Sequence, residues 1–372
     1  MHPMTGNRAL IHLSNLEANI RTVRRIIGKD VKICMAVKAD AYGHGSIEIV
    51  RAASRAGVDC FGVANAGEGS ELRRAGIEDE IIVYGLAPPE EYALLLEHRL
   101  FPFVADAPGI DSLGEAARRE GTRLPVHLKI DTGMGRIGCT PDDAPELAAR
   151  IAESRGLELG GTCTHFACAD SADPAFTERQ IERFDSAVEA IRKRGIDPGI
   201  RHAANSGAVI GHPRAHYDMV RPGIMLYGYY PSKEQPRREK LHPVMELETR
   251  IIYVKRVPRG TPLSYGSIYR TPRETLIATV PVGYADGLSR GLSNRLEVTC
   301  RGRAYPVAGR ICMDLSMIDL GPDSDAELYD EVTLFGPPPA VSDAETLADL
   351  LGTIPYEITC SVGGRIPRHY CE

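Results

Sequence analysis

The chain has 372 residues, a formal net charge of −6 and 43% hydrophobic residues. This length suffices for two domains, or for one barrel with an appendage, and either arrangement can bury a large core. Because charges of both signs are spread along the chain, no basic surface for nucleic acid or for an anionic membrane is expected.

The cysteines and the N-terminal segment exclude further classes of protein. The nine cysteines are scattered and include no C-x-x-C pair, so neither a disulfide framework nor a zinc cluster is expected. Cys163 and Cys168 flank His165, but the second ligand pair of a zinc site is missing. No apolar signal region or bilayer-length segment is found. We therefore expect a soluble, cytoplasmic protein without metal, nucleic-acid partner or membrane partner.

The N-terminal two thirds of the chain are predicted to form a barrel. Ser14 and Glu17 form the S-x-x-E pattern of a capping box, which predicts a helix that ends near Gly28. A further helix is expected over Pro174–Arg194, with Gly195 as its stop. Eight apolar runs predict strands at Val31–Val37, Cys60–Ala64, Ile81–Tyr84, Phe101–Val104, Val126–Ile130, Leu159–His165, Gly199–Ala203 and Asp218–Leu226. Eight repeated βα units predict a (β/α)8 TIM barrel.

A change of composition predicts a second domain. After Tyr230 the chain becomes polar and rich in proline, which indicates a linker and a boundary near residue 240. Residues 1–240 are then the barrel domain, with residues 1–30 as a leading segment and helix, and residues 241–372 form a mainly antiparallel β domain. Its strands are expected at Val244–Val257, Thr275–Val282, Leu296–Arg301, Leu315–Leu320 and Glu331–Phe335, and Ser342 with Glu345 predicts a capped helix.

Lys38 is the most informative side chain. It ends the first expected strand in the segment A-V-K-A-D-A-Y-G-H-G, on the same face as the small Cys34 and Ala36. Tyr42 and two glycines follow, in a loop able to approach a phosphate. A partly unprotonated amine in this position can form an imine with an aldehyde. The alternative is an ordinary surface lysine at a strand end.

Polar residues also end the later strands, and barrel strand ends converge on one mouth. The segments are H-L-K-I-D-T-G-M-G-R at 127–136, T-H-F-A at 164–167, H-A-A-N-S-G at 202–207 and M-V-R-P-G-I at 219–224. Together with L-S-Y-G-S at 263–267, V-G-Y-A-D-G at 282–287, G-R-I-C-M-D at 309–314 and I-P-Y-E-I at 354–358, they resemble the alanine racemase family. The resemblance runs from Leu10 to Arg368.

The resemblance implies pyridoxal 5′-phosphate as cofactor and alanine as substrate. Arg221 would face the pyridine nitrogen and, because a guanidinium keeps its proton, would leave that nitrogen neutral and favour proton exchange over other reactions. Arg136 would contact the phenolic oxygen of the cofactor and the carboxylate of the substrate. The implied cofactor-binding residues are Lys38, Tyr42, Arg136, His165, Asn205, Ser206, Arg221, Gly223, Ile224 and Tyr356.

Racemisation requires an acid or base on each face of the cofactor. Lys38 would serve one face and Tyr265 the other; because tyrosine titrates near ~10, Tyr265 would depend on the positive field of Arg221 and His165. The resemblance implies a homodimer in which Tyr265 reaches the barrel of the other subunit. The implied product, D-alanine, supplies peptidoglycan. Met313 would help to hold the substrate, and Tyr284, Arg290 and Asp314 would line the channel.

Several of these residues have plainer interpretations. Lys129 matches a position that is often N-carboxylated in the family, and its alternative is a pair with Asp131. Ser206 has the alternative of a helix N-cap, and Arg221 that of a surface pair with Asp218. Tyr265 has the alternative of a turn tyrosine packed on the β domain. For Asp286, turn capping is favoured.

Two departures from the family pattern and three rival functions remain. Gly363 stands where serine is common and Asp40 where asparagine is frequent, and neither removes a proposed catalytic atom. The rivals are a racemase of broader amino-acid specificity, a pyridoxal-phosphate decarboxylase of the same architecture, and a barrel that carries the cofactor without catalysis. Arg221 argues against the decarboxylase, which is expected to have an acidic partner at the pyridine nitrogen.

Overall fold

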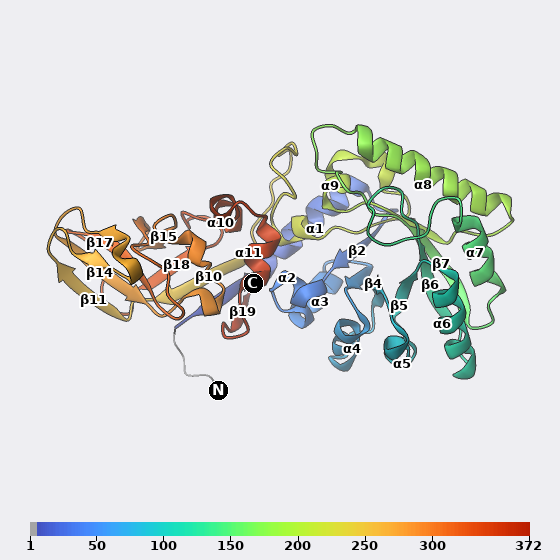
Figure 1. Ribbon diagram of the computed structural model, residues 1–372, viewed down its shortest axis with the longest axis horizontal. Coiled ribbons are helices and arrows are strands. Elements are labelled where there is room, and N and C mark those ends of the chain that lie inside the picture. The colour runs from blue at the N-terminus through green and yellow to red at the C-terminus, as the bar shows by residue number, and fades with distance from the viewer. Residues whose placement is uncertain (1–5) are drawn as a thin grey trace.

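The computed structural model describes residues 6–372 and has the predicted architecture, a parallel barrel followed by a mainly antiparallel β domain (Figure 1). The barrel closes in the order of its strands, and all of its neighbouring strands are parallel. Its strands are β2 (Lys32–Ala36), β3 (Cys60–Val63), β4 (Glu80–Leu86), β5 (Phe101–Val104), β6 (Leu124–Lys129), β7 (Leu157–Cys163), β8 (Ile200–His202) and β9 (Met219–Val220).

The last barrel strand is shorter than expected. The prediction of a strand over Asp218–Leu226 was wrong beyond Val220, because Pro222 has no N–H to donate to a neighbouring strand. Ile224 then begins the short helix η3 (Ile224–Tyr227). The helices that surround the barrel are α3 (Ser46–Arg55), α4 (Ala66–Arg74), α5 (Tyr92–Glu97), α6 (Ala107–Arg119), α7 (Ala144–Glu153), α8 (Ala175–Lys193) and α9 (Ser206–Gly211).

The two predicted capping boxes do not form. Helix α1 (Leu13–Ile27) follows His12, so Ser14 lies inside the helix. Helix α10 (Ala344–Leu351) is capped by Asp343, whose side chain accepts from the N–H of Thr346. Ser14 lies two residues after the N-cap of α1, and Ser342 lies one residue before the N-cap of α10. Helix ends predicted from sequence patterns are commonly wrong by one or two residues.

The β domain contains two main sheets. The larger has the order β16-β15-β18-β10-β1-β19, and the smaller has the order β11-β14-β17. Ile251 and Ile252 divide the single run expected over Val244–Val257 into β10 (Met245–Arg250) and β11 (Tyr253–Val257). The other strands and the remaining long helix are β1 (Arg8–His12), β12 (Pro262–Leu263), β13 (Tyr269–Arg270), β14 (Thr275–Val280), β15 (Glu297–Cys300), β16 (Arg303–Pro306), β17 (Ser316–Gly321), β18 (Glu331–Phe335), β19 (Arg368–Cys371) and α11 (Pro355–Ser361).

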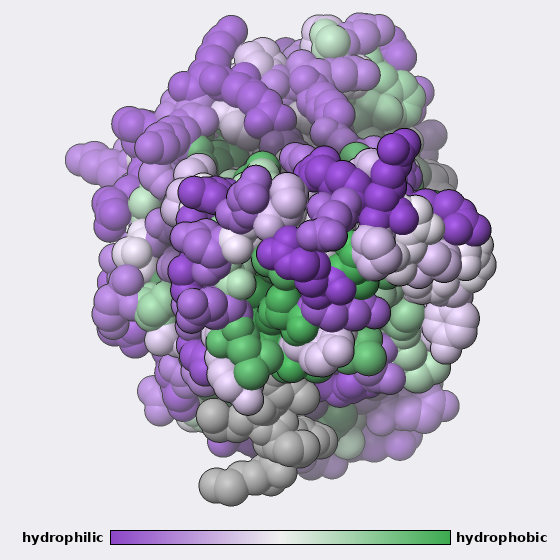
Figure 2. All heavy atoms as spheres, turned by 90° about the vertical axis from the view of Figure 1, so that its left-hand side faces the viewer, coloured by the Kyte–Doolittle hydropathy of each residue, from purple (hydrophilic) through white to green (hydrophobic). Residues whose placement is uncertain are grey.

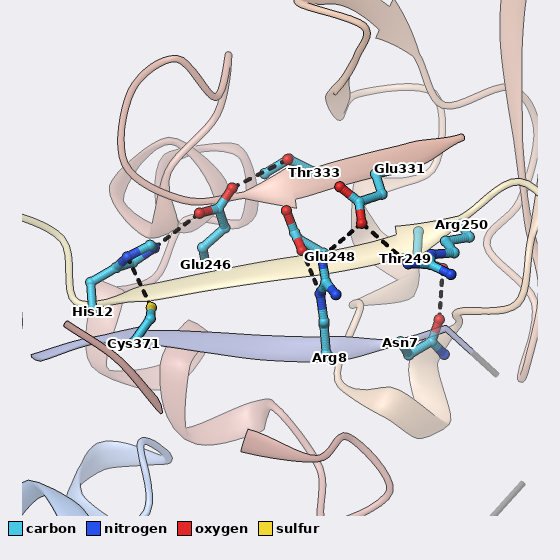
Figure 3. Close-up of polar contacts among 10 residues, drawn as sticks. All are labelled: Asn7, Arg8, His12, Glu246, Glu248, Thr249, Arg250, Glu331, Thr333 and Cys371. Carbon is cyan, nitrogen blue, oxygen red and sulfur yellow. Dashed lines mark hydrogen bonds and ion pairs between the residues drawn. The ribbon is translucent and has the colours of Figure 1, made fainter. Parts of the chain in front are cut away.

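Strand β1 lies in the larger sheet of the β domain, although the sequence analysis placed residues 8–12 in the leading segment of the barrel domain. It pairs antiparallel with β10 and parallel with β19. Ala9 and Ile11 are fully buried on one face, which fixes the register because a shift by one residue would expose both. On the other face Arg8 pairs with Glu248 at 2.7 Å (Figure 3). Such partly exposed ion pairs add at most about 1 kcal/mol each, so apolar burial determines the pairing.

Candidate active site

The carboxyl ends of the barrel strands enclose a cavity. Lys38 follows β2, His165 follows β7, Arg221 follows β9, and Tyr356 comes from α11, which packs against the turn after Lys38. The cavity brings together ten of the residues that the sequence predicted for the site, namely Lys38, Tyr42, Lys129, Arg136, His165, Asn205, Ser206, Arg221, Gly223 and Tyr356. Ile224 is buried directly after Gly223.

Lys38 precedes a turn with unusual backbone geometry. Residues 39–42 have φ angles of 53°, 52°, 53° and 55°, a left-handed conformation that non-glycine residues adopt at an energetic cost. Burial lowers the pKa of the Lys38 amine, and the nearby guanidinium of Arg136 lowers it further. A larger fraction of the amine is therefore unprotonated near neutral pH, as an imine-forming lysine requires.

Two phenols and a glycine form one wall of the cavity. The ring of Tyr42 lies 5.6 Å from the ring of Tyr356 and 4.7 Å from that of Tyr227, measured between centroids. A Cβ atom added at Gly223 would lie 2.5 Å from the Tyr42 hydroxyl, so no larger residue fits there. Burial raises the pKa of both Tyr42 and Tyr356, which keeps the two phenols protonated and able to donate hydrogen bonds.

The hydroxyl of Ser206 is an acceptor within the protein. It accepts from the N–H groups of Gly223 at 3.0 Å and Met225 at 3.3 Å. The alternative of Ser206 as a helix cap is wrong, because Asn205 caps α9 by accepting from the N–H of Ala208. Two accepted bonds use both lone pairs of the hydroxyl, so its proton is available to an anionic ligand.

Arg221 is buried and held by several acceptors. Its Nη1 donates to Nδ1 of His202 at 2.6 Å, and its Nη2 donates to the carbonyl of Thr164 at 2.6 Å. Nη2 also lies 3.4 Å from Nδ1 of His165. The guanidinium is thereby fixed in one plane at the floor of the cavity, as a residue that donates to a ring nitrogen must be.

Within residues 6–372, neither of the two alternative ion pairs is formed, that of Arg221 with Asp218 or that of Lys129 with Asp131. Asp218 pairs with Arg201 at 2.8 Å and not with Arg221. Asp131 accepts from the backbone N–H groups at positions 133 and 135, while Lys129 donates to two backbone carbonyls. Lys129 is 2% exposed, and burial lowers the pKa of its amine. A buried lysine without a carboxylate partner suits a position that carries an added negative group.

Sequence reasoning missed a pair of buried histidines. Nε2 of His202 lies 2.8 Å from Nδ1 of His127. Because Arg221 donates to Nδ1 of His202, His202 carries its proton on Nε2 and donates it to His127. Burial lowers the pKa of His127 to about 3, so the pair is uncharged. The period of two along β6 places His127 and Lys129 on one face, and this signal was present in the sequence.

The structure does not bring Tyr265 to Lys38. Tyr265 is 73% exposed, Met313 is 53% exposed and Tyr284 is 43% exposed, and within the described residues none of the three lines the cavity. Arg290 is also exposed. The alternative in which Tyr265 packs on its own β domain is wrong, because most of its surface is free. In one chain, the second expected proton carrier is absent from the cavity.

A loop cluster near these exposed residues is fixed by carboxylates. Asp286 caps its turn, as expected, by accepting from the N–H of Gly283 at 3.0 Å. Arg365 lies 3.1 Å from the carboxylate of Asp286 and 2.9 Å from that of Asp314. Asp314 thus already has a partner, and Arg365, which the sequence analysis did not single out, joins the loops that carry Tyr284 and Met313.

In the part of the chain that the structure describes, no three histidine, cysteine, aspartate or glutamate side chains are grouped so as to hold a metal ion. None of the helices within residues 6–372 combines the length and apolar character needed to cross a bilayer.

Known proteins are similar to this chain over nearly its whole length. The family described as "Alanine racemase, N-terminal domain" matches residues 11–231, and "Alanine racemase, C-terminal domain" matches residues 244–370. The alanine racemase of Treponema denticola is 46% identical over 376 residues, covering 99% of this chain and 99% of its own.

Solved structures show the same fold. The alanine racemase of Streptomyces coelicolor A3(2) superimposes with a TM-score of 0.94 and 39% identity, covering 99% of this chain and 98% of its own. That of Clostridium difficile 630 has a TM-score of 0.94 and 36% identity, covering 98% and 96%. The chain therefore belongs to the alanine racemase family of pyridoxal-phosphate-dependent isomerases, which interconvert L-alanine and D-alanine.

Proposed function

We propose that the cavity around Lys38 binds the cofactor and that Lys38 is the residue that carries it. The observation that supports this most is a half-buried amine of lowered pKa in the same cavity as the Ser206 hydroxyl and the Arg221 guanidinium. Bound pyridoxal phosphate withdraws electrons from the Cα atom of the substrate and so makes its proton acidic.

Hydroxyl donors suit the phosphate. The protonated phenols of Tyr42 and Tyr356 and the free proton of Ser206 can each donate to a phosphate oxygen. Gly223 allows the backbone to approach closely, and Ile224 lies at the start of a short helix. This donor set fits a dianionic group that is bound by neutral hydrogen-bond donors.

At the other part of the cavity, Arg221 would donate to the ring nitrogen and Arg136 would hold the phenolic oxygen and the substrate carboxylate. Arg221 keeps its proton at all relevant pH values, so it would leave the ring nitrogen neutral. Lys129, if it carries a carboxyl group on its amine, would fix Arg136 through the added negative charge. His165, whose pKa is lowered by burial and by Arg221, would be uncharged beside Arg221. The positive field expected from Arg221 and His165 together would therefore come from Arg221 and not from His165.

The second proton carrier would come from another copy of the chain. We propose a homodimer in which Lys38 serves one face of the substrate and Tyr265 of the partner subunit serves the other. Tyr265 and Met313 are both exposed and outside the cavity, as residues that act in a partner's cavity should be. Tyr284, Arg290 and Asp314 would line the entry. Apolar side chains at the surface of the β domain (Figure 2) also fit burial against a partner.

The cellular role follows from the product. D-alanine is a component of peptidoglycan, so the enzyme would supply cell-wall synthesis from the cytoplasm, where its nine free cysteines would remain reduced.

Reduction of the loaded enzyme with borohydride, followed by peptide mapping, tests the cofactor site. We expect the label on Lys38, and a label on another lysine would contradict the assignment.

A further inference from the structure

Glu68 is a carboxylate outside the cavity that contacts the residue after Lys38. Its Oε1 accepts from the N–H of Ala39 at 2.9 Å, and its Oε2 accepts from the N–H of Ala64 at 2.7 Å. Glu68 lies in the first turn of α4. One side chain therefore joins the loop between β3 and α4 to the turn that begins at Lys38.

The turn needs such a contact because its backbone is strained. Residues 39–42 are all left-handed without a glycine among them, and such strain persists only where surrounding groups hold it. At the far end, Nε of Arg368 donates to the carbonyl of Gly43 at 3.0 Å. In the middle, Asp40 accepts from the N–H of Ser46 at 2.6 Å. Glu68 holds the end next to Lys38.

Glu68 also acts on the charge of Lys38. Burial and Arg136 lower the pKa of the Lys38 amine, whereas the carboxylate of Glu68 and, more weakly, the thiol of Cys360 raise it. Among the groups that influence Lys38, Glu68 is thus the main opposing charge. Glu68 thus partly offsets the lowering of the Lys38 pKa, which matters for a group that must both release and accept a proton.

We propose that Glu68 is the positioning residue of Lys38. Its two charge-assisted hydrogen bonds fix the peptide bond that follows Lys38, and this bond sets where the amine lies in the cavity. The inference rests on the role proposed above for Lys38. Glu68 does not line the cavity, so the proposal gives it no contact with substrate or cofactor and no part in proton transfer.

The test is Glu68→Gln. The amide oxygen can accept only one of the two N–H groups well, and the charge is lost. We expect kcat to fall roughly 10- to 100-fold, the cost of a displaced catalytic group, with KM for alanine within about threefold because no substrate contact is removed. When cofactor-free protein takes up pyridoxal phosphate, the pH midpoint of the uptake rate should move to lower pH, because the amine loses its opposing charge.

Glu91→Gln is the matched control. Glu91 also accepts a backbone N–H close to Glu68, that of Ala66 at the start of α4, at 3.0 Å. No hydrogen bond joins Glu91 to the turn after Lys38 within residues 6–372. The variant should leave kcat within about twofold, as substitutions away from a site usually do. Glu68→Asp keeps the negative charge but has a side chain shorter by one methylene group. It should therefore lower kcat without moving the pH midpoint of cofactor uptake. If the Glu68→Gln variant does not fold, the Glu68→Asp variant tests the positioning role in its place.

Equal kcat and equal uptake midpoints for the Glu68→Gln and Glu91→Gln variants would overturn the inference. A different result would mark failure of the cofactor assignment itself: if Lys38→Ala kept wild-type uptake and activity, the proposed role of Lys38 would be wrong whatever Glu68 does.

Discussion

Arg221 donates to Nδ1 of His202 at 2.6 Å, and both side chains are buried. The bond settles the tautomer of His202, and through it that of His127, so three side chains act as one support beneath the cavity. It also removes the freedom of the guanidinium to rotate. The orientation of Arg221 is therefore fixed by its partners within the barrel.

Replacement of His202 should expose this dependence. His202→Phe keeps a ring of similar size but leaves Nη1 of Arg221 without its buried acceptor. The free energy of unfolding should fall by roughly 1–3 kcal/mol, the cost of an unsatisfied buried donor, and kcat should fall about tenfold or more as Arg221 reorients. Urea unfolding and steady-state kinetics measure both, with His369→Phe, at an exposed histidine, as the control. Unchanged kcat would show that Arg221 is held without His202.

Ser206→Ala tests the phosphate end. The variant loses a donor to the phosphate and leaves the N–H groups of Gly223 and Met225 without their acceptor. Since a hydrogen bond to a charged group contributes about 1.5–3 kcal/mol, Kd for pyridoxal phosphate should rise roughly 10- to 100-fold. Equilibrium dialysis measures it. Ser232→Ala, which removes a hydroxyl bonded to the carbonyl of Asp170 outside the cavity, should leave Kd unchanged; equal effects would contradict the assignment.

Gly223→Ala tests the close approach of the backbone to Tyr42. The added Cβ would lie 2.5 Å from the Tyr42 hydroxyl, so either the phenol or the backbone must move. Overpacking of this kind costs about 1–3 kcal/mol of unfolding free energy, and cofactor affinity should fall with it. At Gly211 an added Cβ meets nothing closer than 3.4 Å, so Gly211→Ala is the control. Equal stability of the two variants would contradict the predicted clash.

Buried neutral histidines predict a loss of stability in acid. Burial lowers the pKa of His44 to about 4, below the ~6.5 of an unfolded histidine. Above pH 6.5 neither state binds the proton, but between about pH 6.5 and 4 only the unfolded state does, so the free energy of unfolding falls as the pH falls, by up to about 1.4 kcal/mol per pH unit for each such histidine. Urea unfolding from pH 7 to 5 should show a shallower slope for His44→Asn. Equal slopes would mean that His44 binds a proton as readily in the folded protein as in the unfolded chain.

Much of the fold and half of the site could be predicted from the sequence. The apolar runs located every barrel strand, and the polar residues at their ends located the cavity, because hydrophobic period and strand-end position are local properties. Strand β1 was missed because its pairing with β10 and β19 depends on distant residues. The left-handed turn at residues 39–42 was missed because no glycine marks it. The contact of Glu68 with this turn could not be foreseen for the same reason.

The position of Tyr265 relative to Lys38 could not be predicted from local sequence patterns. A single chain leaves Tyr265 exposed and outside the cavity, and the proposed homodimer would unite the two residues. The family resemblance supplied this expectation, and no local pattern in the sequence carries it. The proposed reaction would therefore use residues from two subunits in one site.

Mixing two inactive variants tests this claim most directly. Lys38→Ala and Tyr265→Phe chains, unfolded together and refolded as a mixture, should form hybrid dimers in which one of the two sites has both wild-type residues. If chains pair at random, about one quarter of the wild-type activity per protomer should return, although each variant refolded alone stays inactive. No recovery from a mixture shown to contain hybrid dimers would contradict a site shared between subunits.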